Sequence, residues 1–185
     1  MALTAAVIGS LSGCADFFGS STGEAKQVET TGPLTKVNMM TPDEAVAKQL
    51  VPFADAVGMQ VGEGWKPDGT LTPRVGDDCV LPDGTQGVSF TITWSGPGVA
   101  DPDRAAQAIQ AAWKKLGTDV EIVSDANGPA GRILSDPPYL TGTYADDYFV
   151  QLVISKKGTV MEATTHCVID PDQRSDEPNP SAPAS

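Results

Sequence analysis

The order of its periodic segments restricts this chain to a mixed fold. Apolar residues recur at helical spacing in 41–58 and again in 101–117. Apolar and polar residues alternate between and after these segments, first in 88–94 and later in 148–154 and 159–169. An order of helix, strand, helix and then several strands indicates helices on one face of a mainly antiparallel sheet. We therefore expect an α+β domain with two helices packed on one face of such a sheet.

The first helical pattern carries a clear start signal. Thr41 fits the N-cap, Pro42 fits the first helical position, and Glu44 closes a capping box. Pro52 lies inside the apolar pattern, so we expect it to kink or interrupt the helix. Gly58 is the expected stop.

The second helical pattern has signals at both ends. Asp101 is the expected cap, Pro102 opens the helix, and Gly117 ends it. Short strands are expected after it, over Val120–Val123 and Arg132–Leu134.

The N-terminus contains a short apolar run, 2–8, followed by Leu-Ser-Gly-Cys at 11–14. This resembles a bacterial lipobox, where a signal peptidase cuts and the new N-terminal Cys14 carries acyl chains such as palmitate. The run is shorter than the roughly 20 apolar residues that span a bilayer. No Lys or Arg precedes Cys14, so we expect that the start has been trimmed or that the true start lies upstream. The alternative is an incidental cysteine in a disordered N-terminus. We expect a protein anchored by lipid to the extracytoplasmic face of the cell membrane.

Composition divides the chain into four parts. Residues 1–13 are expected to be a signal peptide remnant, and the Gly-, Ser- and Thr-rich residues 14–40 a lipid-anchored flexible tether. The α+β domain is expected over 41–171. Residues 172–185 are rich in Pro, Ser and acidic groups and are expected to form a disordered tail.

Two cysteines remain once lipid modifies Cys14. Outside the cytoplasmic membrane, Cys79 and Cys167 are expected to form one disulfide, which would tie the first and last strands of the sheet together. The alternative is a metal pair assisted by His166, but neither cysteine has a CxxC partner. The oxidising compartment favours the disulfide.

The charge of the chain excludes one class of partner. The formal net charge is −12, from 12 basic and 24 acidic residues. Binding to nucleic acid requires clustered Lys and Arg, and an anionic lipid surface attracts the same residues. We therefore expect no nucleic acid partner, and we read the acidity as a solubility feature.

Chemical motifs are absent from the sequence. His166 is the one histidine, expected on the face of the last strand, and no GxSxG, HExxH or SxxK pattern occurs. The acid pairs at 77–78 and 146–147 match no calcium loop and are explained by loop solvation. We therefore expect no catalytic residue, no metal site and no cofactor.

The remaining candidates for a binding surface are aromatic residues. Tyr139, Tyr144, Tyr148 and Phe149 surround a segment rich in Gly, Pro and Asp. Tyr148 and Phe149 are expected to fill the core or cover the sheet edge. Tyr139 and Tyr144 are the candidates for an exposed contact surface, because tyrosines beside loops are enriched in binding surfaces.

The succession of helix, Trp65-Lys66, Cys79, strand, helix, hairpin and Cys167 is similar to small actinobacterial cell-envelope lipoproteins of the LppA type. The resemblance spans most of 41–169 and rests on element order and the two cysteines. It implies a lipid anchor and a disulfide. It transfers no catalytic residue, because those lipoproteins lack an assigned reaction.

Three functions follow as hypotheses. The first is a non-enzymatic domain that binds an envelope protein or a cell-wall partner. The second is a carrier or sensor of a lipid or small hydrophobic molecule, which requires an apolar cavity of roughly a few hundred Å³ between helices and sheet. The third, a hydrolase, requires His166 or an acid pair in a cleft.

Overall fold

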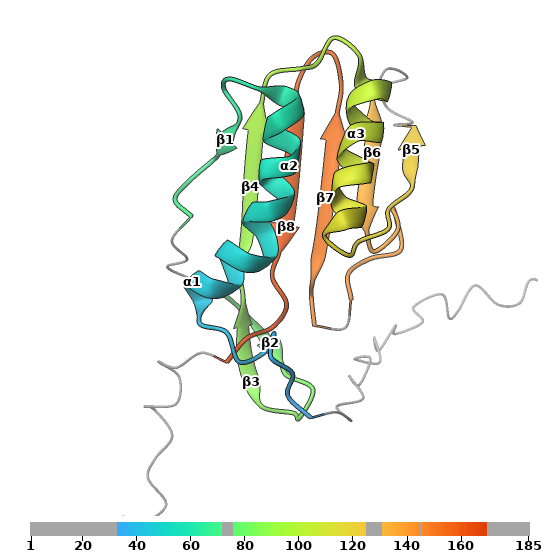
Figure 1. Cartoon of the computed structure of the whole chain (residues 1–185). Coiled ribbons are helices and arrows are strands. Elements are labelled where there is room, and N and C mark those ends of the chain that lie inside the picture. The colour runs from blue at the N-terminus through green and yellow to red at the C-terminus, as the bar shows by residue number, and fades with distance from the viewer. Residues whose placement is uncertain (1–32, 72–75, 125–130, 145, 170–185) are drawn as a thin grey trace, which may run out of the picture.

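A computed structural model describes residues 33–71, 76–124, 131–144 and 146–169. Its centre is a six-stranded sheet in which all neighbouring strands are antiparallel, with the helices on one face (Figure 1). In spatial order the strands are β1 (Lys66–Pro67), β4 (Thr91–Gly96), β8 (Thr159–Thr164), β7 (Phe149–Ile154), β6 (Arg132–Asp136) and β5 (Ile122–Ser124). The expected α+β class is confirmed.

The first helical segment is continuous but changes its geometry. α1 (Pro42–Ala45) begins at Thr41, whose side chain accepts from the Glu44 N–H, so the capping box is present. A π-helical turn, Val46–Leu50, then leads into α2 (Val51–Val61). Pro52 lacks an N–H, and the wider turn just before it lets the helix continue instead of breaking.

The helix ends three residues later than expected, at Val61. Gly62 adopts a φ of 80°, which suits glycine at a helix end. Gly58 has another role, since a Cβ atom there would lie 2.9 Å from Cδ1 of Trp65. Close packing, and not chain termination, therefore explains this glycine.

α3 (Pro102–Lys115) matches the expected helix. The Asp101 side chain accepts from the Arg104 N–H, and Gly117 follows the helix with a φ of 98°. α3 packs against α2 and lies over β5 and β6 (Figure 1).

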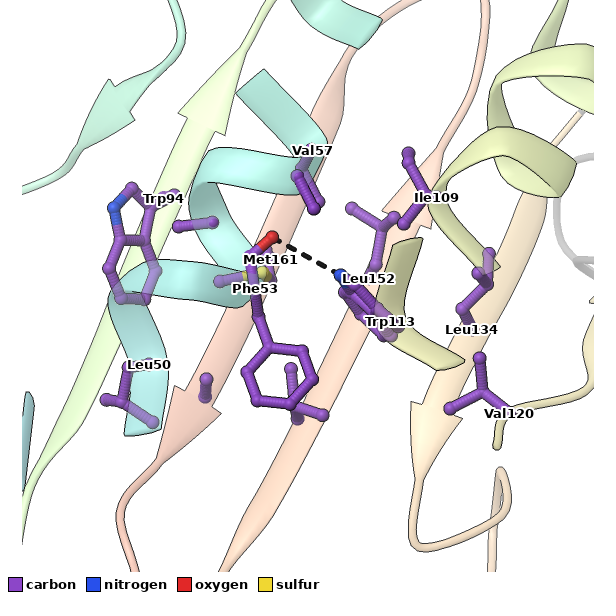
Figure 2. Packing of buried hydrophobic residues seen from close by; sticks show 14 of the residues in the cluster. Leu50, Phe53, Val57, Trp94, Ile109, Trp113, Val120, Leu134, Leu152 and Met161 are labelled. Atoms are coloured by element: carbon purple, nitrogen blue, oxygen red, sulfur yellow. Dashed lines mark hydrogen bonds between the residues drawn. The ribbon is translucent and has the colours of Figure 1, made fainter. Parts of the chain in front are cut away.

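The core fills the space between the two helices and the sheet (Figure 2). Trp113 of α3 is fully buried, and its ring meets that of Phe53 edge to face, with centroids 5.3 Å apart. Leu152 of β7 and Met161 of β8 face the same cluster from the sheet. Trp65 packs against the cluster, and its Nε1–H donates to the carbonyl of Ala54 at 2.9 Å.

The single strand expected over 88–94 is divided in the structure. Gln86–Ser89 form β3, which pairs with β2 (Asp77–Val80) in a separate two-stranded sheet, while β4 belongs to the large sheet. Phe90 links the two and bonds to Thr165, with both the N–H and the C=O of Phe90 engaged. The alternation of apolar and polar residues indicates which side chains are buried, but it does not indicate which strand pairs with this segment. The break at Phe90 therefore cannot be read from the pattern.

The Cys79–Cys167 disulfide is confirmed, but its expected place within one sheet is wrong. Cys79 lies in β2, and Cys167 lies beyond the end of β8. The bond therefore joins the small sheet to the segment that follows the large one. Gly87 permits this contact, because a Cβ there would lie 2.8 Å from the Cys167 sulfur.

Residues that composition assigns to the tether lie against this disulfide. Cys79, Leu81 and Cys167 form a small hydrophobic cluster, which we call the disulfide cluster. Leu34 packs on this cluster, and Asn38 is buried. The Asn38 side-chain amide donates to the carbonyl of Cys167 at 2.9 Å, and the backbone carbonyl of Asn38 accepts from the Ile169 N–H.

The β7–β8 hairpin turns at 155–158 as expected, but β8 ends at Thr164 and not at Ile169. The chain then leaves the sheet, because Thr165 bonds to Phe90 and Val168 to Val88. His166 consequently lies beyond the C-terminal end of β8 and not on the face of that strand. Within the described ranges, no helix has the length and apolar character needed to cross a membrane.

Candidate functional site

Three rings form a stack where β8 ends and β7 begins. The rings of Tyr148 and His166 are nearly parallel, with centroids 4.1 Å apart and an interplanar angle of 7°. Tyr144 stacks on Tyr148 at 5.9 Å and 27°. We call these three residues the aromatic stack.

His166 is held on three sides. Its Nδ1 lies 2.6 Å from Oδ2 of Asp146, its ring lies on Tyr148, and its backbone N–H donates to Oε1 of Gln49 at 2.8 Å. Gln49 belongs to the π-helical turn, so this irregular helix contributes directly to the site. His166 is thus not isolated on an open strand face.

The Asp146 carboxylate fixes the histidine tautomer. Burial alone would raise the pKa of Asp146, but hydrogen bonds from His166 and from the backbone of Asp146 and Tyr148 outweigh it and lower the pKa. Asp146 is therefore ionised at neutral pH and can only accept, so Nδ1 of His166 carries the proton and donates. Asp147, with a φ of 63°, makes the sharp turn that brings Asp146 and Tyr148 together.

The two stacked tyrosines differ in exposure. Tyr148 is 6% exposed, and burial is the main reason that its pKa rises to about 12. Tyr144 is 45% exposed, and its hydroxyl donates to Oδ1 of Asp136 at 2.6 Å. This hydrogen bond raises the pKa of Tyr144, because the Asp136 carboxylate disfavours a second negative charge.

A tight turn lies next to the stack. Thr141 donates from its backbone N–H and its hydroxyl to the carbonyl of Pro138, which closes a four-residue turn. Leu140, the third residue of the turn, has a φ of 67° and is 85% exposed. A positive φ at this position is the arrangement of a type II turn and is strained for leucine. Tyr139 occupies the second position and is half-buried.

A pocket of about 250 Å³ lies beneath this turn. Its walls come from the end of β6, from loop residues 137–143 and from the start of β7. Ser135 and Gln151 are register partners, and their neighbours Leu134 and Leu152 face the helices. Side chains alternate along a strand, so Ser135 and Gln151 line the pocket from the opposite face of the sheet.

Ser135 is the unusual residue of the pocket. It is 8% exposed, and its Oγ has no hydrogen-bond partner in the described part of the chain. A buried polar group without a partner costs about 1 to 3 kcal/mol, so this hydroxyl lowers the stability of the fold locally.

The expected contact residues are thus brought to one place. Tyr144 belongs to the stack and donates to Asp136, and Tyr139 and Asp136 both line the pocket. Tyr148 is buried as expected, while Phe149 is half-buried and lines the pocket. The sequence analysis missed the role of Asp136 and explained Asp146 by loop solvation alone.

Other candidate residues lie elsewhere. Asp77 and Asp78 are exposed in β2. Among the described residues, no group of three or more His, Cys, Asp or Glu side chains is arranged to hold a metal ion. Cys14 and its motif lie outside the described residues, as do the signal peptide remnant and the tail at 172–185. The pocket has no lining residue from α2 or α3, so it does not supply the cavity that a carrier would need between helices and sheet.

Comparisons with known proteins add a distant likeness. No family model and no curated protein matches the chain. Among solved structures, it is similar to a DUF4853 family protein from Actinomyces odontolyticus, at 14% identity and a TM-score of 0.46. The match covers 80% of this chain and 76% of the other. A likeness of this size carries no conclusion about activity, ligand or anchoring.

The two stacked tyrosines provide a test of the site by alkaline titration. The chain has three tyrosines, and we expect Tyr148 to ionise last, near pH 12. Folding favours its neutral phenol, so this contribution to stability is complete below pH 10 and is lost as the pH rises toward 12. The loss amounts to about 2 to 3 kcal/mol. Ultraviolet absorbance of the phenolate measures the ionisation of the tyrosines, and circular dichroism over the same pH range measures the loss of folded structure.

Tyr148→Phe is the matched control for this titration. It should remove the last ionisation step and flatten the alkaline loss of stability. Simultaneous ionisation of all three tyrosines in a chain that is still folded would contradict the burial of Tyr148.

Proposed function

We propose that this chain is an extracytoplasmic lipoprotein, anchored to the membrane through Cys14, whose domain binds a protein or cell-wall partner without catalysis. The lipobox-like motif at 11–14 and the resemblance to envelope lipoproteins of the LppA type support the anchor. The Cys79–Cys167 disulfide agrees with this location, because such bonds persist outside the cytoplasm.

The observation that carries the binding proposal is the rigid display of exposed side chains at 138–144. Leu140 and Tyr144 are exposed, yet neither is loosely held. The turn hydrogen bonds fix Leu140, while stacking on Tyr148 and the bond to Asp136 fix Tyr144. An aromatic group that is already ordered loses little entropy on binding, which is typical of residues that dominate interfaces.

The arrangement around His166 supports a structural role for this histidine. A hydrolase of the Ser-His-Asp type needs a hydroxyl or thiol bonded to the second imidazole nitrogen. Among the described residues, no hydroxyl or thiol makes a hydrogen bond to His166, and Cys167 beside it is oxidised. The histidine and Asp146 instead hold the aromatic stack in place.

A photocrosslinking experiment in an actinobacterial host tests the proposal. A photoreactive phenylalanine replaces Leu140, and in a matched control it replaces Met59, which is 74% exposed on α2. We expect the chain in the membrane fraction and a defined adduct from position 140 that position 59 does not give. Adding Tyr144→Ala should lower the adduct yield about tenfold, because truncating an interface anchor costs more than 1 kcal/mol. Cys14→Ala should release the chain from the membrane fraction.

Two controls separate the parts of the proposal. Val160→Ala shortens an exposed apolar side chain of β8 outside the loop and should leave the adduct unchanged. Retention of the Cys14→Ala chain in the membrane fraction would refute the anchor. Equal adducts from positions 59 and 140, or none from 140, would refute the contact surface.

A further inference from the structure

We propose that the pocket beside the aromatic stack takes one basic side chain, an arginine or a lysine, from a protein partner. This inference rests on the proposed function and specifies the chemistry of the partner at the same surface.

The size of the pocket favours a single side chain. Its volume is about 250 Å³, and it lies between β6, β7 and the loop at 137–143. Sites for drug-sized ligands hold roughly 300 to 1,000 Å³. A lipid chain or an oligosaccharide exceeds this space, whereas the end of one long amino-acid side chain fills it.

The walls suit the stem of a basic residue. Pro137, Pro138 and Leu140 supply aliphatic surface, and Tyr139 and Phe149 supply aromatic rings. Lysine and arginine bury their methylene groups along apolar surface of this kind while the charged end seeks a polar partner. A cation also gains from lying close to an aromatic face.

The polar groups of the pocket suit a ligand end that only donates hydrogen bonds. Asp136 belongs to the wall and contributes a negative charge there, while its Oδ1 accepts from the Tyr144 hydroxyl. Ser135 also lines the pocket, but its hydroxyl oxygen is itself covered by neighbouring atoms. Gln151 adds an amide oxygen. A guanidinium has five N–H donors and no acceptor, and an ammonium has three donors, so both match these acceptors.

The negative charge around the pocket disfavours an anionic ligand. None of the pocket's lining residues in the described chain is a lysine or an arginine. Asp136 lies in the pocket wall and Asp146 lies beside the stack, so an anionic group would meet carboxylates without a counter-charge. The net charge of −12 also draws a cationic partner toward the protein.

Nuclear magnetic resonance on the full chain tests the inference. The ¹⁵N-labelled chain carries Cys14→Ala, so that it is free of lipid, and is produced with its disulfide formed. The probes are Nα-acetyl-arginine amide, Nα-acetyl-lysine amide, the neutral isostere Nα-acetyl-citrulline amide and N-acetylglucosamine. We expect both cationic amides to shift the backbone signals of the pocket residues saturably. The citrulline amide should bind about tenfold more weakly than the arginine amide or not at all, since it lacks the charge.

Three variants identify the groups involved. Asp136→Asn keeps an oxygen that can accept from Tyr144 but removes the charge, and should weaken binding of the arginine amide about tenfold. Ser135→Val adds bulk at the pocket wall without changing its charge and should weaken binding. Asp77→Asn removes an exposed charge on β2 and should have no effect. Unchanged signals from the core around Trp113 and Phe53 show that Asp136→Asn and Ser135→Val remain folded.

Several outcomes would overturn the inference. One is equal binding of the citrulline and arginine amides. Another is a response of the pocket to N-acetylglucosamine without any response to the cations, which would indicate a cell-wall sugar. If the arginine amide fails to bind while the adduct from position 140 persists, the inference fails and the proposed function stands. If the adduct is absent while the arginine amide binds, partner binding fails and the preference of the pocket for a cation stands.

Discussion

Replacing Cys79 and Cys167 together by alanine is expected to lower the free energy of unfolding by about 4 to 5 kcal/mol. The bond joins residues separated by 88 positions, and closing so long a loop removes much of the entropy of the unfolded chain. The melting temperature should fall by roughly 15 °C. Urea unfolding and a thermal scan, each on the full chain, measure the two quantities.

The wild-type chain under reducing conditions is the matched control, because it loses the bond without losing the sulfur atoms. It should show most of the same loss. Cys79→Ala alone should cost nearly as much as the double substitution, since the partner thiol has nothing left to bond. A loss below about 1 kcal/mol in the double variant, or two reactive thiols in the oxidised chain, would contradict the disulfide.

The second large effect is expected for Trp113→Ala, which should cost about 3 to 5 kcal/mol of stability. Trp113 is fully buried, packs edge to face on Phe53 and donates from Nε1 to the carbonyl of Phe53 at 3.3 Å (Figure 2). Alanine removes the ring that joins α3 to α2 and leaves a cavity between the helices and the sheet. Urea unfolding measures the loss.

Two variants calibrate this result. Trp113→Phe keeps most of the apolar contact but leaves the Phe53 carbonyl without its donor, so we expect a loss of about 1 to 2 kcal/mol. Trp65→Ala removes a ring of equal size that is only half-buried, and it should cost less than Trp113→Ala. Equal losses at the two tryptophans would show that Trp113 does not lie at the centre of the core.

The elements with strong local signals could be predicted from the sequence. The capping box of Thr41 and Glu44 and the Asp101 cap satisfy backbone groups within three residues, so their effect is readable along the chain. The hairpin at 155–158 and the buried face of α3 follow from equally local patterns. These features were enough to give the α+β class.

The features that depend on contacts between distant segments could not be predicted in the same way. The break at Phe90 depends on its bonds to Thr165, and the π-helical turn before Pro52 presents Gln49 to the backbone N–H of His166. Both are tertiary adjustments of a pattern that stays regular in the sequence.

The candidate site was predicted only in part. Tyr139 and Tyr144 stand out by composition, because they lie in a loop rich in Gly, Pro and Asp. Their supports, Asp136 and the Asp146–His166 pair, are separated from each other by up to 30 residues, and only the fold brings them together. The Ser135 hydroxyl has no partner among the residues that the structure describes, and this could not be predicted because serine is common in strands of every environment.

The first and last described segments of the chain lie side by side at one end of the domain. Leu34 and Ile169 pack on the same disulfide cluster, and Ile169 donates to the carbonyl of Asn38, while the turn at 155–158 lies at the far end of the sheet (Figure 1). A circular permutant can therefore join the two ends by a short linker and open between Lys156 and Lys157, both exposed. Such a chain would keep the register of every strand pair, which means that this architecture does not require its elements in their present order.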